Sequence, residues 1–308
     1  MTQFAPRISV LPDSHPLFAT AVTDGGGVLT DLDDNPDGLV VGFNPDRAAL
    51  KTILDTRPTI RWVQLPSAGI ESYMDTIAAY PEKIWTSAKG AYAPPVGEHA
   101  LALTLALLRQ LPERVRATSW GPQAGTSLHG LNVLVVGAGG IGVEIVRLMK
   151  AFNTNVTVVR RQNITVPGAD RTVTSEALAQ VLPDADVVVL AAALTTSTRQ
   201  LLGAPELALL KPSAVVVNIA RGGLIDTDAL CAALAADRLA GAGLDVTYPE
   251  PLPDGHPLWA EPKALITPHS ADTFEMVASL LAARVAENVR RFASGQELAG
   301  VVDPVAGY

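Results

Sequence analysis

Cysteine is almost absent from this chain of 308 residues, which contains only Cys231. One thiol cannot form an internal disulfide, and its place in the apolar repeat DALCAALAA favours a small packed residue over a reactive one. Aromatic residues make up 5% and charged residues 18%, while 48% are hydrophobic, which is typical of a globular enzyme and not of a disordered or fibrous chain. The low cysteine content suits a reducing compartment, so we expect a cytoplasmic protein.

Long apolar runs, basic blocks and metal-binding patterns are also missing. The most apolar stretch, residues 101–108, is far shorter than a membrane span, and the N-terminus lacks the pattern of a secretory leader, so we expect a soluble protein with no membrane partner. The chain has 23 Lys and Arg against 31 Asp and Glu, a net charge of -8, which argues against a nucleic acid partner. Metal-ligand spacing is not found among His15, His99, His129 and His256, so we predict no metal.

The length and the order of apolar segments predict two α/β domains. In the first ninety or so residues, short strands at 7–11, 38–43, 60–65 and 83–88 alternate with helical stretches at 45–55 and 70–80. A central region holds strands at 131–137, 155–159, 185–191, 214–219, 241–246 and 264–267. The central strands are runs of Val and Leu without alternation, which indicates a parallel sheet covered by helices on both faces. This predicts a doubly wound nucleotide-binding domain, followed from about Thr273 by a helix that returns to the first domain.

A helix over residues 96–109 is predicted to be apolar nearly all round. Such a helix is buried against other protein, either within the chain or at a subunit contact. Residues 111–130 show no clear period and are interpreted as a long linking arm. Glu98 and His99 lie on the apolar helix, and a structural role is favoured for them over a catalytic pair.

The turn GAGGIG, residues 137–142, follows an apolar strand and opens a helix, which is the context of a dinucleotide-binding fingerprint. The first glycine, Gly137, permits the tight turn, and the second, Gly139, allows the backbone to approach a pyrophosphate. The third, Gly142, allows the helix to pack closely on the strand, while the helix N-terminus supplies donors. We assign Gly137, Gly139, Gly140, Ile141 and Gly142 to cofactor binding.

The next strand ends in the sequence VTVVRRQN, where NAD-binding domains have an acidic residue for the adenosine ribose. Here Arg160 and Arg161 occupy that place, and guanidinium groups suit a 2′-phosphate through their charge and forked donors. This favours NADPH as cofactor, with NADH possible.

Three polar residues follow three successive strands of the predicted sheet: Arg221, Glu250 and His269. Because ligands bind beyond the carboxyl ends of parallel strands, these side chains are expected at the same edge as the glycine turn. Together they suit hydride transfer to a carbonyl next to a carboxylate. Arg221 would hold the carboxylate and polarise the carbonyl, His269 would donate the proton, and Glu250 would orient the imidazole and favour its charged form.

The string NIARGGLID, the segment GLDVTYPEPLPDGHPLW with ITPHSA after it, the turn GAGGIG and the helix VGEHALALTLALLR together resemble the D-isomer-specific 2-hydroxyacid dehydrogenase family. The resemblance covers about Leu65 to Phe292 and is specific in the order of its motifs. It implies that Arg221, Glu250 and His269 are catalytic and that Asp245 contacts the nicotinamide side. It also implies that the turn from Ser67 to Ile70 offers backbone N–H groups to the substrate carboxylate; the contacts expected there are Ala68, Gly69 and Ile70.

The same resemblance implies a domain arrangement and an assembly. A flavodoxin-like substrate domain, residues 1–92 and 275–308, would receive the inserted Rossmann cofactor domain, residues 93–274. Members of the family are commonly dimers joined through a region that corresponds here to residues 96–130, so a homodimer is expected. Leu194, Thr198 and Ala220 are expected to line the cofactor.

Departures from the family pattern bear on the substrate. Arg160 in place of the acid is similar to the NADPH-preferring glyoxylate and hydroxypyruvate reductases. Ala193 stands where proline is frequent, Ala220 where glycine is frequent, and Ser270 follows the histidine. The predicted activity is therefore NADPH-dependent reduction of a small 2-ketoacid. A phosphoglycerate dehydrogenase-like NAD enzyme and a nucleotide-sensing, corepressor-like binding protein stay open as alternatives, whereas formate dehydrogenases pair the histidine with glutamine instead of Glu250.

Overall fold

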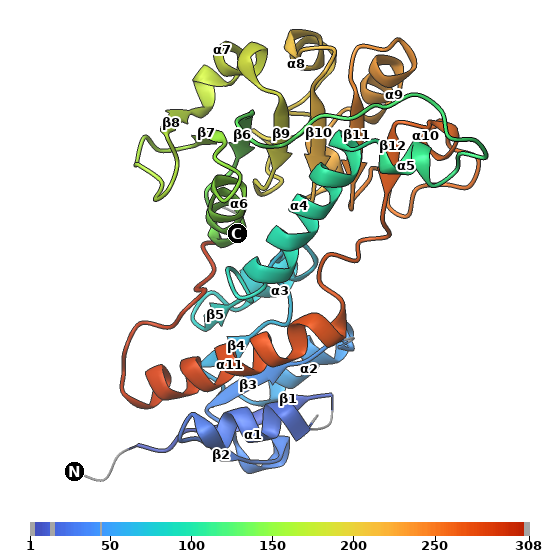
Figure 1. The fold of residues 1–308 in the computed structure, drawn as a ribbon. Helices are drawn as coiled ribbons and strands as arrows, with labels where there is room; N and C mark the ends of the chain where they lie inside the picture. Colours follow the sequence, from blue (N-terminus) through green and yellow to red (C-terminus); the bar gives the residue numbers. More distant parts are fainter. Residues whose placement is uncertain (1–3, 13–15, 44, 305–308) are drawn as a thin grey trace. The chain divides into compact units, whose positions relative to one another are not determined.

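A computed structural model describes residues 4–12, 16–43 and 45–304 of the chain (Figure 1). The chain divides into two compact units, unit 1 with Met1–Tyr92 and Thr273–Tyr308, and unit 2 with Ala93–Asp272. Unit 2 is thus one continuous segment inserted into the sequence of unit 1.

Unit 1 contains a five-stranded parallel sheet in the order β2-β1-β3-β4-β5. Its strands are β1 (Arg7–Leu11), β2 (Val28–Leu29), β3 (Gly38–Val41), β4 (Trp62–Gln64) and β5 (Ile84–Thr86). Its helices are α1 (Pro16–Asp24), α2 (Arg47–Thr56), α3 (Met74–Ala79) and α11 (Phe274–Ala293). This strand order is that of flavodoxin-like folds, in agreement with the expected fold class.

The helices of unit 1 cover both faces of this sheet. Helix α11 packs beside α1 in unit 1 (Figure 1). Leu50 and Leu54 of α2 and Ile77 of α3 join strand residues in one buried cluster. The predicted strands all form. Strand β2 and helix α1 were not predicted, and β2, with two residues, is too short to show an alternation.

Unit 2 contains a seven-stranded parallel sheet in the order β12-β11-β10-β9-β6-β7-β8. Its strands are β6 (Asn132–Val136), β7 (Asn155–Arg160), β8 (Arg171–Thr174), β9 (Val187–Leu190), β10 (Val215–Asn218), β11 (Gly241–Leu244) and β12 (Ala264–Ile266). Its helices are α4 (Ala93–Leu108), α5 (Leu111–Arg114), α6 (Gly140–Lys150), α7 (Leu178–Val181), α8 (Ala204–Leu209), α9 (Thr227–Ala235) and α10 (Pro257–Ala260). The order reverses between β6 and β9, as in a doubly wound Rossmann domain.

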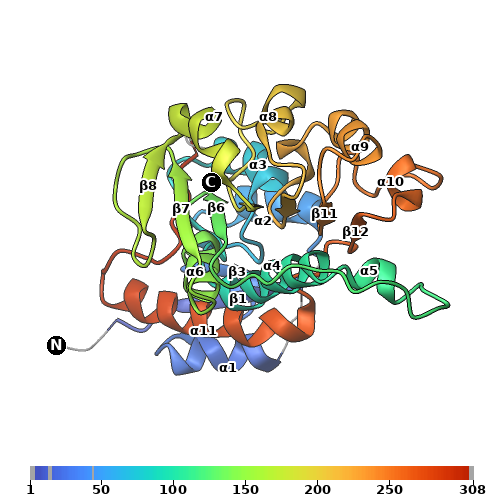
Figure 2. The same cartoon turned by 45° about the horizontal axis from the view of Figure 1, so that its top comes forward.

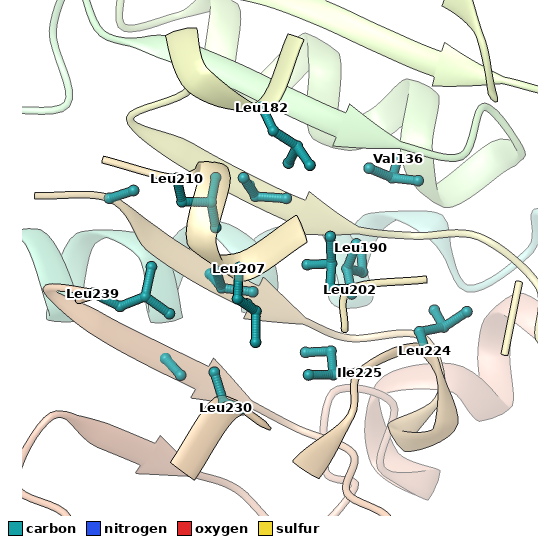
Figure 3. Packing of buried hydrophobic residues seen from close by; sticks show 14 of the residues in the cluster. Val136, Leu182, Leu190, Leu202, Leu207, Leu210, Leu224, Ile225, Leu230 and Leu239 are labelled. Atoms are coloured by element: carbon teal, nitrogen blue, oxygen red, sulfur yellow. The ribbon is translucent and has the colours of Figure 1, made fainter. Parts of the chain in front are cut away.

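Every residue of β9, β10 and β11 is buried, which explains why all of them except Asn218 are apolar residues or glycine. Helices α4 and α6 lie on one side of the sheet and α7, α8 and α9 on the other (Figure 2). On the second side Leu182, Leu190, Leu207 and Leu230 meet in a continuous core (Figure 3). Strand β8 was not predicted because it is a partly exposed edge strand with the polar sequence RTVT.

Helix α4 packs against α6, β10 and β11. A Cβ atom added to Gly243 would lie 3.0 Å from the Cβ of Leu103, so glycine lets the helix approach β11 closely. The apolar residues on one side of α4 are therefore explained by their burial within unit 2. After α5 the arm has no regular structure up to Asn132, and it exposes Val115 and Trp120, the latter with 91% of its surface accessible.

Across the described ranges, none of the helices is both long enough and apolar enough to cross a lipid bilayer.

Candidate active site

Three neighbouring strands of unit 2, β10, β11 and β12, deliver the proposed catalytic residues. Arg221 lies three residues beyond β10, Glu250 lies on the segment after β11, and His269 lies three residues beyond β12. Because the strands are parallel and hydrogen-bonded in register, their carboxyl ends form one edge of the sheet. The topology thus brings residues from three distant parts of the sequence to one edge of the sheet.

Glu250 and His269 are in direct contact. The distance from Nδ1 of the imidazole to Oε1 of the carboxylate is 2.7 Å, and both side chains are partly exposed. Since Nδ1 donates its proton to the carboxylate, the second ring nitrogen, Nε2, does not take part in this contact. An imidazole held in this way can present a proton from Nε2 to a substrate oxygen.

The backbone of His269 adopts a left-handed conformation with a φ of 49°. This region is uncommon for residues other than glycine and persists only where the surroundings enforce it. The His269 N–H donates to the carbonyl oxygen of Asp245 at 2.8 Å and to that of Thr267 at 3.0 Å. The turn after β12 is therefore fastened to the end of β11.

The Asp245 carboxylate holds the same turn. Its Oδ1 accepts hydrogen bonds from the Ser270 N–H at 2.9 Å and the Thr267 hydroxyl at 2.6 Å, and its Oδ2 accepts from the Ala271 N–H at 3.2 Å. The side chain is 99% buried, and Nε2 of His99 lies 3.3 Å from Oδ1. Burial alone would raise the pKa of this carboxyl, but the hydrogen bonds from His99, Thr267 and Ser270 outweigh it and lower the pKa to about 2. Asp245 is therefore ionised at neutral pH.

The backbone at Arg221 is held by hydrogen bonds with Asn218, a residue that the sequence offers no reason to expect at the site. Asn218, fully buried at the end of β10, accepts from the Ala220 N–H at 3.1 Å and donates to the Arg221 carbonyl at 2.9 Å. At Gly222 the chain runs so close to the next loop that an added Cβ would lie 1.9 Å from the Thr247 carbonyl oxygen. The loop that carries Arg221 therefore packs directly on the segment that leads to Glu250.

Asp272 is a further charged residue at this edge that was missed. Burial raises the pKa of its carboxyl, while the charges of His269 and Arg221 act in the opposite direction. The position of Asp272 in the sequence, three residues after His269, does not reveal that it lies at the site. Its location depends on the turn whose N–H groups Asp245 binds.

The glycine turn between β6 and α6 has the geometry that a pyrophosphate requires. Gly137 has a φ of 109°, and an added Cβ would lie 2.6 Å from the backbone of Ala191. A Cβ on Gly142, the third residue of α6, would lie 2.2 Å from the Gly137 carbonyl oxygen. Any larger residue at this position would therefore displace the backbone of the turn. Gly139, in contrast, faces open space with no described atom within 4 Å of such a Cβ. Gly139 and Gly140 are exposed whereas Gly142 is buried, so the exposed part of the turn lies at the start of α6, where Gly140 and Ile141 form the first turn.

Arg160 is the last residue of β7, where a ribose-binding acid would stand, and Arg161 follows it as an exposed residue. Nη1 of Arg160 donates to the Ile164 carbonyl at 3.2 Å. The backbone at the end of β7 lies next to the glycine turn, since β6 and β7 are paired in register and the Gly137 N–H donates to the Val159 carbonyl at 2.8 Å.

The loop after β9 contains the other expected cofactor contacts. The Thr198 hydroxyl donates to the Ala193 carbonyl at 2.7 Å and accepts from the Thr195 N–H at 2.7 Å, which fixes the loop without the proline frequent in relatives. Leu194 packs against Gly223, so this loop touches the turn after Arg221.

The expected substrate contacts Ala68, Gly69 and Ile70 lie in unit 1, after β4. The Ser67 hydroxyl donates to the Gly69 carbonyl at 2.6 Å, which shapes the turn. Ala68 and Gly69 are partly exposed, whereas Ile70 is buried, so their role as substrate contacts stays a prediction.

No cluster of three or more His, Cys, Asp or Glu residues suited to a metal is found among residues 4–12, 16–43 and 45–304. His15 lies outside these residues. Cys231 is partly buried, and burial raises the pKa of its thiol, which fits a packed residue.

Comparison with known proteins was made on sequence and on structure. The profile of the D-isomer specific 2-hydroxyacid dehydrogenase NAD binding domain matches residues 101–271. A protein of Corynebacterium melassecola, described as uncharacterized and in the proB 3' region, is 38% identical over 94% of this chain and 96% of its own. The glyoxylate reductase of Aeropyrum pernix is 30% identical over 79% of this chain and 76% of its own.

Among solved structures, a D-isomer specific 2-hydroxyacid dehydrogenase from Xanthobacter autotrophicus, crystallised with NADPH and MES, superposes with a TM-score of 0.84. It is 26% identical, and the alignment covers 99% of this chain and all of that one.

Proposed function

Because the chain belongs to the D-isomer-specific 2-hydroxyacid dehydrogenase family, and is thus an oxidoreductase with a nicotinamide cofactor, we propose that it reduces a small 2-ketoacid with NADPH. The substrate is of the glyoxylate or hydroxypyruvate type, and a chiral product has the D configuration. The observation that carries this proposal is the 2.7 Å contact between His269 and Glu250 at the sheet edge that also carries Arg221.

In the proposed mechanism each of these side chains has one task. Arg221 binds the substrate carboxylate and polarises the adjacent carbonyl through its fixed donors. His269 delivers a proton from Nε2 to the carbonyl oxygen as that oxygen gains negative charge. Glu250 fixes Nδ1 and stabilises the imidazolium before transfer. The cofactor, when bound, supplies the hydride to the carbonyl carbon.

The preference for NADPH is supported by the residues at the end of β7. Arg160 and Arg161 stand where NAD-binding domains have an acidic residue, and the charge and N–H donors of guanidinium groups suit a 2′-phosphate. The structurally similar Xanthobacter dehydrogenase was crystallised with NADPH. A small substrate is supported by the glyoxylate reductase of Aeropyrum pernix and the glyoxylate/hydroxypyruvate reductase A of Serratia proteamaculans, the latter 28% identical over 90% of this chain.

Steady-state kinetics with purified protein test the proposal. Glyoxylate, hydroxypyruvate, pyruvate and 3-phosphohydroxypyruvate are each assayed with NADPH and NADH by the loss of absorbance at the nicotinamide band. We expect turnover of glyoxylate or hydroxypyruvate, with kcat/KM at least about tenfold higher for NADPH. A preference for the phosphorylated ketoacid with NADH would favour a phosphoglycerate dehydrogenase-like enzyme, and no turnover of any ketoacid would refute the proposal.

We also propose that the active protein is a homodimer joined through α4 and the arm. The arm exposes Trp120 and Val115, at 91% and 78% of their surfaces, in a segment without regular structure. Large exposed apolar side chains of this kind are typical of a protein contact.

A further inference from the structure

His99 contacts two residues that are far from it in sequence. Its Nε2 lies 2.9 Å from the Thr267 hydroxyl oxygen, 168 positions along the chain, and 3.3 Å from Oδ1 of Asp245. All three residues belong to unit 2, and His99 is carried by α4, the helix that packs on β10 and β11. The histidine of the Glu98–His99 dipeptide therefore has a defined contact, which the sequence did not reveal.

The direction of these hydrogen bonds follows from the partners. The Thr267 hydroxyl donates its only proton to the Asp245 carboxylate at 2.6 Å, so its oxygen can only accept from His99. Nε2 of His99 therefore carries a proton, and this N–H points at the pair formed by Thr267 and Asp245. The result is a chain of donors that ends on one buried carboxylate.

That carboxylate has little freedom left. Its two oxygens accept from the Thr267 hydroxyl and from the Ser270 and Ala271 N–H groups. These two N–H groups directly follow His269, whose backbone is in the left-handed region with a φ of 49°. Such a conformation needs surrounding contacts to persist. The orientation of Asp245 thus decides whether the turn keeps the imidazole of His269 against Glu250.

We propose that His99 is a positioning residue for the reaction: through Thr267 it fixes the Asp245 carboxylate, which fixes the turn that presents His269. The inference rests on the proposed function, because it assigns His269 as the proton donor. His99 touches neither His269 nor Glu250 and acts only through the two intermediate residues. A long helix that is packed on the sheet is a rigid support for this purpose.

Three variants separate a positioning role from a purely structural one. His99→Phe keeps a ring of similar shape but removes the donor, His99→Gln keeps a donor, and Glu98→Gln changes the exposed neighbour as a matched control. We expect His99→Phe to lower kcat about tenfold with the ketoacid KM changed less than about threefold, since substrate contacts are kept. His99→Gln should recover most of the loss, and Glu98→Gln should match the parent. If His99→Phe does not fold, Thr267→Val removes the bridging hydroxyl instead. It should likewise lower kcat while changing the ketoacid KM little.

The effect of His99 on the turn can also be measured without any catalytic activity, which separates a failure of this inference from a failure of the proposed function. Hydrogen exchange measured by mass spectrometry on the peptide spanning 264–273 reports the Ser270 and Ala271 amides. Exchange there should be at least about tenfold faster in His99→Phe and unchanged in Glu98→Gln. Absence of ketoacid turnover by the parent would refute the proposed function. The exchange result would still show whether His99 stabilises the turn that contains Ser270 and Ala271. Unchanged exchange in His99→Phe and Thr267→Val, or faster exchange with an unchanged kcat, would overturn the positioning role.

Discussion

Replacement of Asp245 by asparagine should destabilise unit 2, and the loss should depend on pH. The carboxylate is 99% buried and accepts from Thr267, Ser270 and Ala271. The introduced asparagine would have nearly the same shape, but an NH2 group would replace one of the two oxygens and would face a hydrogen-bond donor. The substitution therefore removes the charge and one acceptor without opening a cavity.

The size of the effect follows from the pKa. Burial opposes ionisation of Asp245, but its hydrogen bonds lower the pKa from 3.8 to about 2. At about 1.36 kcal/mol for each pH unit, this corresponds to about 2 kcal/mol of stability. Because the folded state has the lower pKa, the stabilisation is complete above about pH 5 and is lost as the pH falls toward about 2. About half should be gone at about pH 3.

Urea unfolding followed by hydrogen exchange on peptides of β9 and β10 measures the stability of unit 2 separately from unit 1. The expected difference between the parent and Asp245→Asn is about 2 kcal/mol at about pH 7 and about 1 kcal/mol at about pH 3. Asp254→Asn, at an exposed position of the same unit, should change stability by less than about 0.5 kcal/mol. A difference below about 0.5 kcal/mol at neutral pH, or one that does not shrink in acid, would refute the reasoning.

Four other outcomes are expected. His269→Gln should lower kcat about 100- to 10,000-fold, because the proton donor is lost, with the Kd for NADPH in a fluorescence titration changed less than about threefold. Arg160→Asp should lower kcat/KM with NADPH at least about tenfold and raise it with NADH, because the carboxylate repels a 2′-phosphate. Gly142→Ala should lower Tm by several degrees, since its Cβ would lie 2.2 Å from a carbonyl oxygen, whereas Gly139→Ala should keep Tm and weaken cofactor binding. Trp120→Ser should convert the proposed dimer to monomer in light scattering after size exclusion.

Each of these outcomes has a result that would contradict it. Retained turnover in His269→Gln would remove the imidazole from the mechanism, and an unchanged cofactor ratio in Arg160→Asp would remove the 2′-phosphate contact. Equal melting temperatures for Gly142→Ala and Gly139→Ala would contradict the geometry of the turn. A parent protein that is monomeric at assay concentrations would refute the dimer.

Strands that are buried on both faces were predictable because their sequences are almost entirely apolar. The unalternating Val and Leu residues of β9 and β10 are buried on both faces, so periodicity alone identified them and the parallel sheet. Strands β2 and β8 were missed for the opposite reason: β2 has two residues, and β8 is a polar strand at the sheet edge. Their pairing with longer neighbours, not their own composition, makes them strands.

The glycine turn and the three strand-end residues were predictable for a similar reason. Residue types that only a tight turn or a reaction requires stood at fixed places relative to strong strands. Asn218, Thr267 and Asp272 carried no such signal, because each is an ordinary polar residue until the loops around it close. Their roles come from hydrogen bonds and charges that act between the ends of different strands.

The amino-acid sequence by itself determined the parallel sheets and the residue types at the strand ends, because burial and strand-end position are local or periodic properties. Tertiary structure alone decided which of those residues touch: the 2.7 Å contact of His269 with Glu250, and the bond of His99 to Thr267 across 168 positions. Such contacts depend on how neighbouring strands pair and how closely glycines let loops approach, and neither property can be read from the residues in isolation.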